Sequence, residues 1–382
     1  MNAGRFDVFY GFSQIEVRGE MPTERRMFEN LIRQVKLADA LGFGTAWIGG
    51  AHLSLQEQHR SGARPVLPHF RGEVCPNTDI LQLATLLMSE TRQIGIGSAI
   101  HSILVNGGPV AHAEAVRTFL TMKSLGPHAH RMLRLGFASG RFDFVQEVFG
   151  IAPRTAAERA VWPAVKGVVL REATEIFVRL LRGDALASGD LPPRFLADGT
   201  EIPPFWTFDR IRLVPLESPL ETLRLYLGTT DRATVEAANA VLPCRVFNLS
   251  STAAATIDAT HVHMAGVYHP DGGPWQRRYM PRTVLVFVDS TRAIAAERAL
   301  AAVEAWQRAM EGTVDPAKVA QGMNNAVFGT PDEVASQIAE RFHPDDRLMV
   351  WFDFNDHDTE RVERTMHDFV AHVVPLIESR VA

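Results

Sequence analysis

The chain has 382 residues, of which 46% are hydrophobic, and its net charge at neutral pH is -5. This composition supports a large buried core, and the near-neutral charge, with no basic patch or acidic tail, argues against nucleic acid or an anionic membrane as partner. The sequence has no apolar run of about 18 residues, no signal-peptide pattern at its start and only two cysteines, Cys75 and Cys244, so we expect a soluble cytoplasmic protein without disulfide bonds.

Short apolar strands alternate with helices along the chain. The first predicted strand is Phe6–Phe12, and the first predicted helix, Glu24–Leu41, ends just before a glycine, as helices commonly do. Asn77 or Thr78 is expected to cap the second predicted helix, which begins at Asp79. Further strands are predicted at Thr45–Gly49, Gln93–Ala99, Met132–Ala138, Thr222–Leu227, Cys244–Leu249, Arg282–Asp289 and Leu348–Phe354, and further helices at Asp79–Ser89, Pro109–Met122, Ala164–Leu181, from about Ala233, and at His357–Ile377.

Eight strands alternating with helices is the number in a (β/α)₈ TIM barrel, and a doubly wound open sheet is the alternative. We expect one α/β barrel domain over residues 1–382, although the length also allows two domains. Three blocks read as irregular insertions at the C-terminal face of the barrel: 53–76, 183–219 and 252–280. In such a barrel, excess loops of this kind often cover the active site.

Five segments are informative as an ordered set. They are LADALGFGTAW from Leu37, CPNTDILQLATLLMSETRQIGIGSA from Cys75, GGPVAHAEAVRTF from Gly107, MLRLGFASGRFDFVQEVFG from Met132, and FGTPDEVASQIAERF from Phe328 with LMVWFDFND after it. In this order they resemble the bacterial luciferase-like, flavin-dependent monooxygenases over most of the chain, least across 184–280. The resemblance implies a TIM barrel that holds reduced FMN, or less often the deazaflavin F420, at its C-terminal face. It also implies a homodimer.

The resemblance places the flavin phosphate after the strand Thr222–Leu227. The loop there contains a glycine, hydroxyls and a guanidinium at the start of a helix, and helix N-termini favour anions. An ordinary helix cap is the alternative for the same residues. The residues implied in phosphate binding are Gly228, Thr229, Thr230, Arg232 and Thr234.

The flavin ring requires a flat and mostly apolar wall. Small residues at two predicted strand ends, Ser98 and Ala99 on one and Ala138 on the other, suit that wall, with tight barrel packing as the alternative. The loop Ser139–Gly140–Arg141 is expected to add a phosphate or ribityl contact, unless Arg141 is simply solvated. Relatives often carry a strained non-proline cis peptide on the third strand, and the candidate here is Ser98–Ala99.

His52 and His101 are the candidate catalytic residues, because histidine moves protons near neutral pH. His52 aligns with the second histidine of a Glu-His-His pattern that is common in the family. Gly50 and Ala51 stand where the glutamate and the first histidine are expected, which disfavours luciferase-type chemistry. Ala138 likewise stands where luciferase carries a reactive cysteine. A structural loop histidine is the alternative for both residues.

The sequence thus predicts a monooxygenase that uses O₂ and FMN, reduced by a separate flavin reductase, to hydroxylate or Baeyer–Villiger oxidise an apolar organic substrate. Side chains of Gly62–Phe70 are expected to shape the substrate entrance. The alternatives are hydride transfer with F420 or flavin, and a non-catalytic flavin-binding or partner subunit. No metal is expected: His261 and His263 form a pair at alternate positions without a convincing carboxylate or lysine set around it. No P-loop, nucleophile elbow or dinucleotide fingerprint is present.

Overall fold

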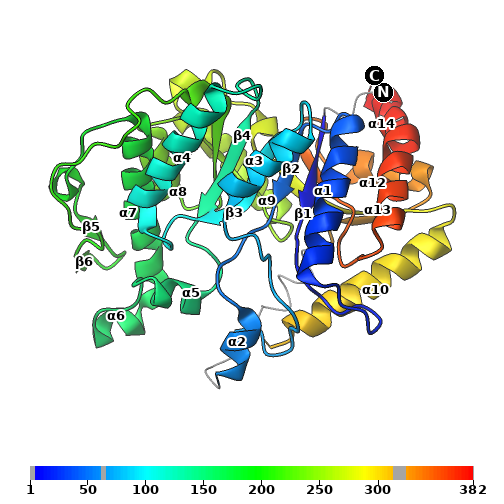
Figure 1. The fold of residues 1–382 in the computed structure, drawn as a ribbon, viewed down its shortest axis with the longest axis horizontal. Coiled ribbons are helices and arrows are strands. Elements are labelled where there is room, and N and C mark those ends of the chain that lie inside the picture. The colour runs from blue at the N-terminus through cyan, green and yellow to red at the C-terminus, as the bar shows by residue number, and fades with distance from the viewer. Residues whose placement is uncertain (1–4, 62–65, 313–323, 382) are drawn as a thin grey trace. The chain divides into compact units, whose positions relative to one another are not determined.

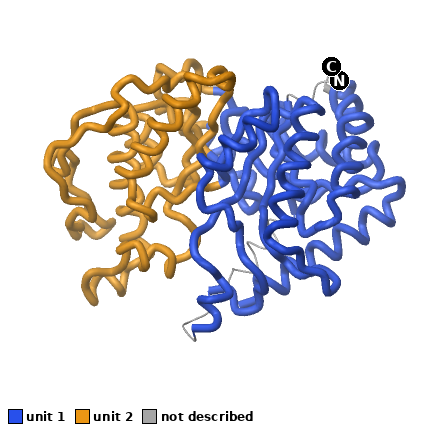
Figure 2. Tube along the Cα trace, viewed as in Figure 1, with its two compact units in different colours: residues 1–99, 247–261, 276–382 blue, residues 100–246, 262–275 orange. Residues whose placement is uncertain are grey.

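The computed structural model describes residues 5–61, 66–312 and 324–381. Their contacts group into two compact units (Figure 2). The first unit comprises residues 1–99, 247–261 and 276–382, and the second comprises 100–246 and 262–275. Among the described residues, no helix combines the length and the apolar character that crossing a membrane requires.

The strands of the first unit form a parallel sheet in the order β10-β9-β11-β1-β2-β3. Every residue of β9 is buried, as expected when helices cover both sides of parallel strands or a barrel closes on itself. Val8 of β1 pairs with Val350 of β11 on one side and with Ala46 of β2 on the other. The strands are β1 (Phe6–Tyr10), β2 (Thr45–Ile48), β3 (Gly95–Ser102), β9 (Arg282–Val288), β10 (Ala326–Gly329) and β11 (Leu348–Trp351) (Figure 1).

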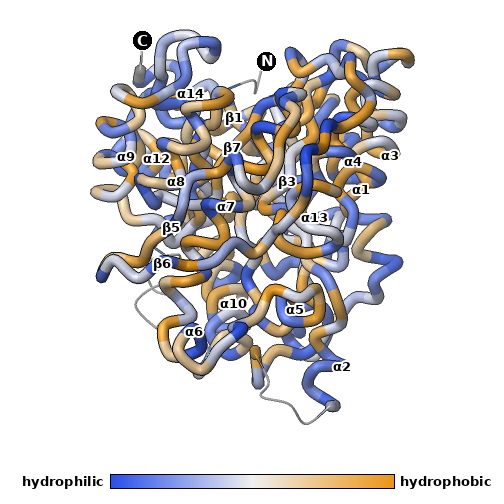
Figure 3. Tube along the Cα trace, turned by 90° about the vertical axis from the view of Figure 1, so that its left-hand side faces the viewer, coloured by the Kyte–Doolittle hydropathy of each residue, from blue (hydrophilic) through white to orange (hydrophobic). Residues whose placement is uncertain are grey.

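Most helices of the first unit begin at a Thr, Ser or Asp cap. Thr330 and Glu333 form a capping box at the start of α12, which also has a proline in its first turn. The small helix α2 is almost entirely hydrophilic (Figure 3). The helices are α1 (Glu24–Ala40), α2 (Leu55–Arg60), α3 (Ile80–Glu90), α10 (Arg292–Met310), α12 (Pro331–Arg341), α13 (Thr359–Asp368) and α14 (Val374–Val381), with a π-helical turn at Phe369–Val373.

The second unit begins within β3, and its strands β4, β7 and β8 are parallel neighbours in that order. Phe137 of β4 packs against Phe177 of α7, with ring centroids 5.1 Å apart. The strands are β4 (Leu133–Ala138), β7 (Leu223–Leu227), β8 (Cys244–Val246) and the short antiparallel pair β5 (Arg194–Phe195) and β6 (Glu201–Ile202). The helices are α4 (Gly108–Ser124), α5 (Asp143–Val148), α6 (Ala156–Ala160), α7 (Trp162–Arg182) and α8 (Arg232–Asn239).

Three expectations about elements are wrong. The block 252–280 is not irregular throughout, because it contains helix α9 (Ala254–Val267). Its buried residues Ile257, Thr260 and Met264 have helical spacing, but alanines and the 73% exposed Val262 between them hide the pattern. Strand β10 is short and was not predicted. The cap of α3 is Asp79, whose Oδ1 accepts hydrogen bonds from the backbone of Leu81 and Gln82.

Candidate functional site

The strand ends of the second unit lie at one edge of its sheet. β4 and β7 are in register, with Phe137 opposite Leu227, and the next amide, Gly228 N–H, donates to Phe137 O at 2.9 Å. Just past β3, the N–H of Ile103 donates to Ala138 O at 3.1 Å. Since parallel strands end at the same edge, the segments that follow β3, β4 and β7 come together there. This edge carries most of the residues that the sequence indicated.

Three residues from these strands form a small apolar surface. A Cβ placed on Gly228 would lie 2.4 Å from Cδ1 of Ile100 and 3.1 Å from Cβ of Ala138, so a side chain at this position would displace the end of the Ile100 side chain. The absence of a side chain lets β3, β4 and β7 meet in apolar contact at Ile100, Ala138 and Gly228. This arrangement fits the flat, apolar wall that a flavin ring requires. Ile100 was not anticipated from the sequence.

The loop after β4 is held by two buried side chains that the sequence reasoning missed. Ser102 Oγ donates to Ser139 O at 2.9 Å, and Nε2 of Gln146 donates to the same oxygen at 2.8 Å. Gln146 is 1% exposed and also contacts Gly140 O at 3.3 Å. Gly140 has a φ of +83°, which glycine adopts without strain. The backbone of this loop is therefore fixed, and the exposed Arg141 follows it.

Helix α8 is capped by a carboxylate of its own. Oδ2 of Asp231 accepts hydrogen bonds from Thr234 N at 2.9 Å and from Thr234 Oγ1 at 2.6 Å. Thr229 Oγ1 accepts from Asp231 N at 3.1 Å. Thr234 is 1% exposed, so its hydroxyl serves the cap, which is the alternative that the sequence left open for it. Thr230 and Arg232 are exposed.

These two loops fit an anion such as the flavin phosphate. The guanidinium groups of Arg141 and Arg232 follow neighbouring strands, and the loop after β7 adds the hydroxyl of Thr230. Asp231 contributes one opposing charge, and its carboxylate already occupies the helix N-terminus. The cations and hydroxyls of the loops, rather than the helix dipole, would therefore hold a phosphate.

His101 lies at the carboxyl end of β3 and is hydrogen-bonded to a second histidine. Its Nε2 is 2.8 Å from Nδ1 of His112, and the two rings are perpendicular at 89°. Nε2 of His112 lies 2.8 Å from the carbonyl oxygen of Val105. His101 is half-buried, and His112, on α4, is 6% exposed. His112 stands in the segment GGPVAHAEAVRTF, but its role was not anticipated.

His52 belongs to the first unit, where it follows β2 and is half-buried. Burial lowers its pKa, and the nearby Asp79 opposes this shift. Gly50 has a structural reason to be glycine, because a Cβ there would lie 2.8 Å from Asn77 O. The N–H of Ala51 donates to Cys75 O at 2.9 Å. Gly50 and Ala51 therefore lie against the backbone of the segment that contains Cys75 and Asn77.

Ser98 and Ala99 also lie in the first unit, within β3. The expected cis peptide between them is wrong: in the described residues the single cis peptide bond is Val214–Pro215. β3 instead continues as a regular strand to Ser102, and Ser98 pairs in register with Ile48. Ser98 is 2% exposed. The second unit thus brings together His101 and the residues of 138–141 and 228–234, whereas His52, Ser98 and Ala99 are placed in the first unit.

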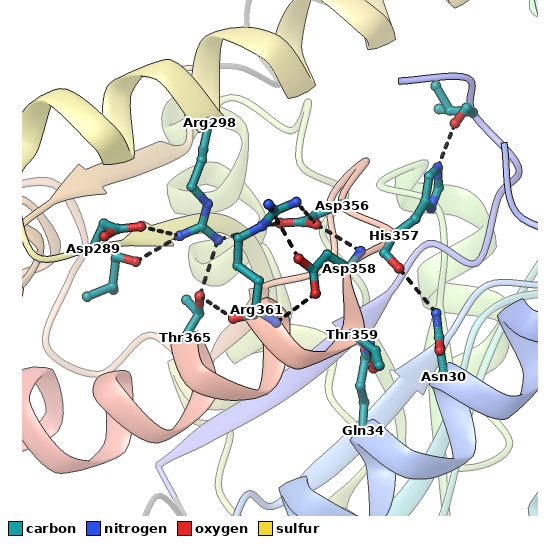
Figure 4. Close-up of polar contacts among 12 residues, drawn as sticks. Asn30, Gln34, Asp289, Arg298, Asp356, His357, Asp358, Thr359, Arg361 and Thr365 are labelled. Carbon is teal, nitrogen blue, oxygen red and sulfur yellow. Dashed lines mark hydrogen bonds and ion pairs between the residues drawn. The ribbon is translucent and has the colours of Figure 1, made fainter. Parts of the chain in front are cut away.

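The strand ends of β9 and β11 in the first unit carry a dense ionic network (Figure 4). Arg298 of α10 donates to Asp289 Oδ2 at 3.0 Å and lies 3.5 Å from Asp356 Oδ2. Arg361 of α13 donates to the same Asp356 carboxylate at 2.8 and 2.5 Å. Asp358 caps α13 through Arg361 N. These contacts tie the loop after β11 to two helices.

One carboxyl group in that loop has an unusual affinity for protons. Burial raises the pKa of Asp353 to about 7, the charge of Asp356 adds to the shift, and the indole N–H of Trp351 opposes it. Burial also raises the pKa of the Tyr10 hydroxyl, with the charge of Asp353 as the next cause. Asp353 is therefore half-protonated near neutral pH.

The histidines considered as a metal pair lie on a helix. Residues at alternate positions share a face only on a strand, whereas His261 and His263 are both on helix α9. In the part of the chain that the structure describes, no three His, Cys, Asp or Glu side chains gather as a metal site. Residues 62–65 of the segment expected to shape the substrate entrance lie outside the described residues.

A scan against protein-family models matches residues 8–344 to the family described as luciferase-like monooxygenase. The chain belongs to this family. Its enzymes are oxidoreductases with a TIM-barrel fold, which confirms the α/β barrel predicted from the sequence. A search of curated proteins finds no match.

Solved structures of this fold are similar over nearly the whole chain. One is the monooxygenase RslO1 from Streptomyces bottropensis, 18% identical, with a TM-score of 0.67 over 98% of this chain and 99% of that one. Another is the oxygenating constituent of 3,6-diketocamphane monooxygenase from Pseudomonas putida in complex with FMN, 12% identical, with a TM-score of 0.59 over 98% of both chains. A third is an F420-dependent secondary alcohol dehydrogenase, 15% identical, with a TM-score of 0.57 over 99% of both. These identities support the shared fold alone.

Proposed function

We propose that this protein is a monooxygenase that uses reduced FMN and O₂ to hydroxylate, or Baeyer–Villiger oxidise, an apolar organic substrate. The observation that carries the proposal is the edge of the second unit. There the apolar contact of Ile100, Ala138 and Gly228 is flanked by His101 and by the loops that carry Arg141 and Arg232. When bound, reduced FMN supplies the electrons that activate O₂.

The residues of the chain have separate tasks in this proposal. Gly228 and Ala138 form the ring wall. The guanidinium and hydroxyl groups of Arg141 and Arg232 with Thr229 and Thr230 hold the phosphate, supported by the Ser139–Gly140 backbone. Thr234 acts through the α8 cap. His101 holds or moves the proton of the substrate reaction, and His52, whose pKa is lowered by burial, is the second candidate.

Three finer statements accompany the proposal. A separate flavin reductase delivers reduced FMN, the protein acts in the cytoplasm, and two copies form a homodimer. Each stays a prediction that rests on the family. O₂ consumption coupled to a flavin reductase tests the first prediction. Cell fractionation tests the second, and light scattering tests the third.

The proposed cofactor can be tested without knowing the substrate. Riboflavin carries the ring of FMN but no phosphate, so the ratio of the two affinities isolates the phosphate contacts. We expect FMN to bind at least tenfold more tightly than riboflavin. Turnover is then tested with reduced FMN, O₂ and a panel of apolar alkanes and cyclic ketones. Products that incorporate one oxygen atom from O₂ support the proposal, and turnover without O₂ contradicts it.

A hydride-transferring oxidoreductase is the second candidate. It is favoured by the similarity to an F420-dependent alcohol dehydrogenase, whereas Gly50–Ala51 in place of Glu-His favours the non-catalytic subunit. Anaerobic turnover with reduced F420 would establish it. A non-catalytic subunit, the third candidate, predicts flavin binding without product under either condition.

A further inference from the structure

The segment Pro203–Trp206, with the sequence PPFW, is a loop of the second unit that several contacts hold in place. It follows β6, and its two prolines restrict the backbone before any contact is made. Arg154 donates hydrogen bonds to the carbonyl oxygens of Pro203 and Pro204, both at 2.9 Å. Its guanidinium also lies 3.9 Å from the centre of the Phe205 ring. These contacts fix the first three residues of the segment.

A buried carboxylate holds the end of the segment. Glu172 lies within α7 and is 1% exposed. Its Oε1 accepts hydrogen bonds from Phe205 N at 3.0 Å and from Trp206 N at 3.1 Å. A carboxylate is buried at little cost only where hydrogen bonds replace those to water, so the bonds to these two amides account for an acidic residue on the buried side of α7.

The side chain that this support presents is Trp206. Its indole lies against the first residue of α4, because a Cβ placed on Gly108 would be 2.7 Å from Nε1 and 3.4 Å from Cε2 of Trp206. Gly108 has no side chain, so the indole approaches the backbone of the helix directly. Trp206 is partly exposed. A fixed and partly exposed indole offers a large, rigid and mostly apolar surface to a ligand.

This indole lies close to His101. Gly108 opens α4 and His112 follows four residues later, so the two positions are about one helical turn, or about 5.4 Å, apart along the same side of the helix. Nδ1 of His112 lies 2.8 Å from Nε2 of His101. All of these residues belong to the second unit. Trp206 and His101 therefore meet neighbouring turns of α4.

We propose that Trp206 is a specificity residue, whose indole forms the apolar wall against which the organic substrate packs beside His101 and whose bulk limits the size of that substrate. Glu172 is a positioning residue that acts through Trp206. The assignment rests on the function proposed above, because it gives the substrate of that reaction a place. It favours compact cyclic molecules, such as small cyclic ketones, because a rigid ring packs against a rigid indole with little loss of conformational freedom.

Fluorine NMR of the full chain labelled with fluorotryptophan, in the presence of FMN, tests the contact. The protein has six tryptophans, and the resonance of Trp206 is the one missing in Trp206→Phe. Cyclohexanone is the probe. We expect it to shift the Trp206 resonance to a saturating value and to leave the resonance of Trp275, assigned in the same way, unchanged. A Trp206 resonance that does not respond to cyclohexanone overturns the inference.

The limit on substrate size is tested by comparing two ketones in calorimetry. Trp206→Ala removes the wall, so it should bind cyclohexanone about tenfold more weakly than the wild type and the much larger cyclododecanone more tightly. Trp275→Ala is the matched control, because Trp275 belongs to the same unit and packs against Tyr268 with ring centroids 5.0 Å apart. The control should leave the ratio of the two affinities as in the wild type. An equal change of this ratio in both variants contradicts a specific role of Trp206.

Substitutions of Glu172 test how Trp206 is held. Glu172→Leu removes the acceptor of the two amides, so we expect the Trp206 fluorine line to broaden and the preference for cyclohexanone to weaken. Glu172→Gln keeps an oxygen that accepts from the same amides, and it should retain the narrow line and the preference. A narrow line in Glu172→Leu contradicts the positioning role. If Glu172→Leu does not fold, the Trp206 variants still decide the inference.

Failure of this inference and failure of the proposed function are distinguishable. If cyclohexanone shifts the Trp206 resonance and Trp206→Ala changes the ratio of affinities, but no oxygenated product forms, the proposed function fails and the binding role of Trp206 stands. If oxygenated product forms with the same preference for ring size in Trp206→Ala and in the wild type, the inference fails alone.

Discussion

The strand ends of the first unit and those of the second are both rich in polar residues, but the contacts of these residues differ. After β9 and β11, the guanidinium groups of Arg298 and Arg361 are engaged by carboxylates around Asp356. After β4 and β7, buried side chains hold the backbone, and Arg141 and Arg232 are exposed. Charge density therefore does not identify a site by itself. The first arrangement ties the loop after β11 to two helices, and we propose that the second binds a ligand.

The largest effect is expected at His101. His101→Ala should reduce product formation by about 10² to 10⁴-fold, because it removes a general acid–base group, while the affinity for FMN changes less than threefold. Steady-state rates and FMN titration measure the two quantities. His52→Ala is the matched comparison from the first unit. If His52→Ala lowers turnover and His101→Ala does not, the catalytic histidine belongs to the first unit, which contradicts the role proposed for His101.

The ionic network of the first unit is expected to serve stability alone. Arg298→Met leaves the carboxylates of Asp289 and Asp356 without this cation, at side-chain exposures of 25% and 8%. Because Asp356 keeps its pair with Arg361, we expect a loss of about 1.5 to 3 kcal/mol of unfolding free energy, the range for hydrogen bonds to charged groups. The control Arg33→Met breaks a pair in which Arg33 is 53% exposed, and it should cost less than about 1 kcal/mol. Urea unfolding compares them, and a selective loss of FMN affinity in Arg298→Met would point to a ligand role.

The cationic loops of the second unit are expected to act on ligand affinity. The double substitution Arg141→Ala with Arg232→Ala should weaken FMN binding by about 10 to 100-fold and leave riboflavin binding unchanged, because it removes charge-assisted bonds to the phosphate. Arg159→Ala, an exposed arginine on α6 of the same unit, is the control. Isothermal titration calorimetry measures both ligands. Equal weakening of FMN and riboflavin would mean that the substitutions distort the site.

Asp353 is expected to make stability depend on pH. Its pKa is about 7 in the folded protein and near 3.8 when unfolded, so the folded state binds more protons between these values. Stability therefore falls as the pH rises from about 4 to about 7, and by no more than about 4 kcal/mol from this group.

Asp353→Asn tests this sign, because asparagine stays neutral. We expect urea midpoints of the variant to change less between pH 5 and pH 8 than those of the wild type. Asp345, whose side chain is 76% exposed, is the control, and the urea midpoint of Asp345→Asn should change with pH as the wild-type midpoint does. If the wild-type urea midpoint rises from pH 5 to pH 8 while that of Asp353→Asn stays constant, Asp353 affects stability in the opposite direction and the prediction is wrong.

Periodic segments could be predicted from the sequence, and exceptions have local causes. α1 and β4 match their predicted spans closely, since their apolar spacing is regular. α9 was missed because only every third or fourth residue is buried among alanines. β10 has four residues, too few for a periodic signal.

The candidate site was predicted as a set of loops, but its supporting contacts were not. Strand-end residues such as Ala138 and Gly228 could be placed because parallel strands end at one edge. Gln146 and His112 act through hydrogen bonds to a distant loop and to a neighbouring ring, and sequence spacing contains no information on such contacts. Thr234 looked like a ligand residue because hydroxyls that cap helices and hydroxyls that bind phosphate occupy the same positions.

The central claim, that the edge of the second unit holds the flavin beside His101, has a direct test. FMN is titrated into protein with ¹⁵N-labelled histidine, and the resonances of His101 and His52 are followed in wild type and in the Arg141→Ala, Arg232→Ala double variant. The account predicts that FMN shifts the His101 resonances at saturation and that the double variant needs about 10 to 100-fold more FMN for the same shift. FMN that binds without any change at His101 would contradict it.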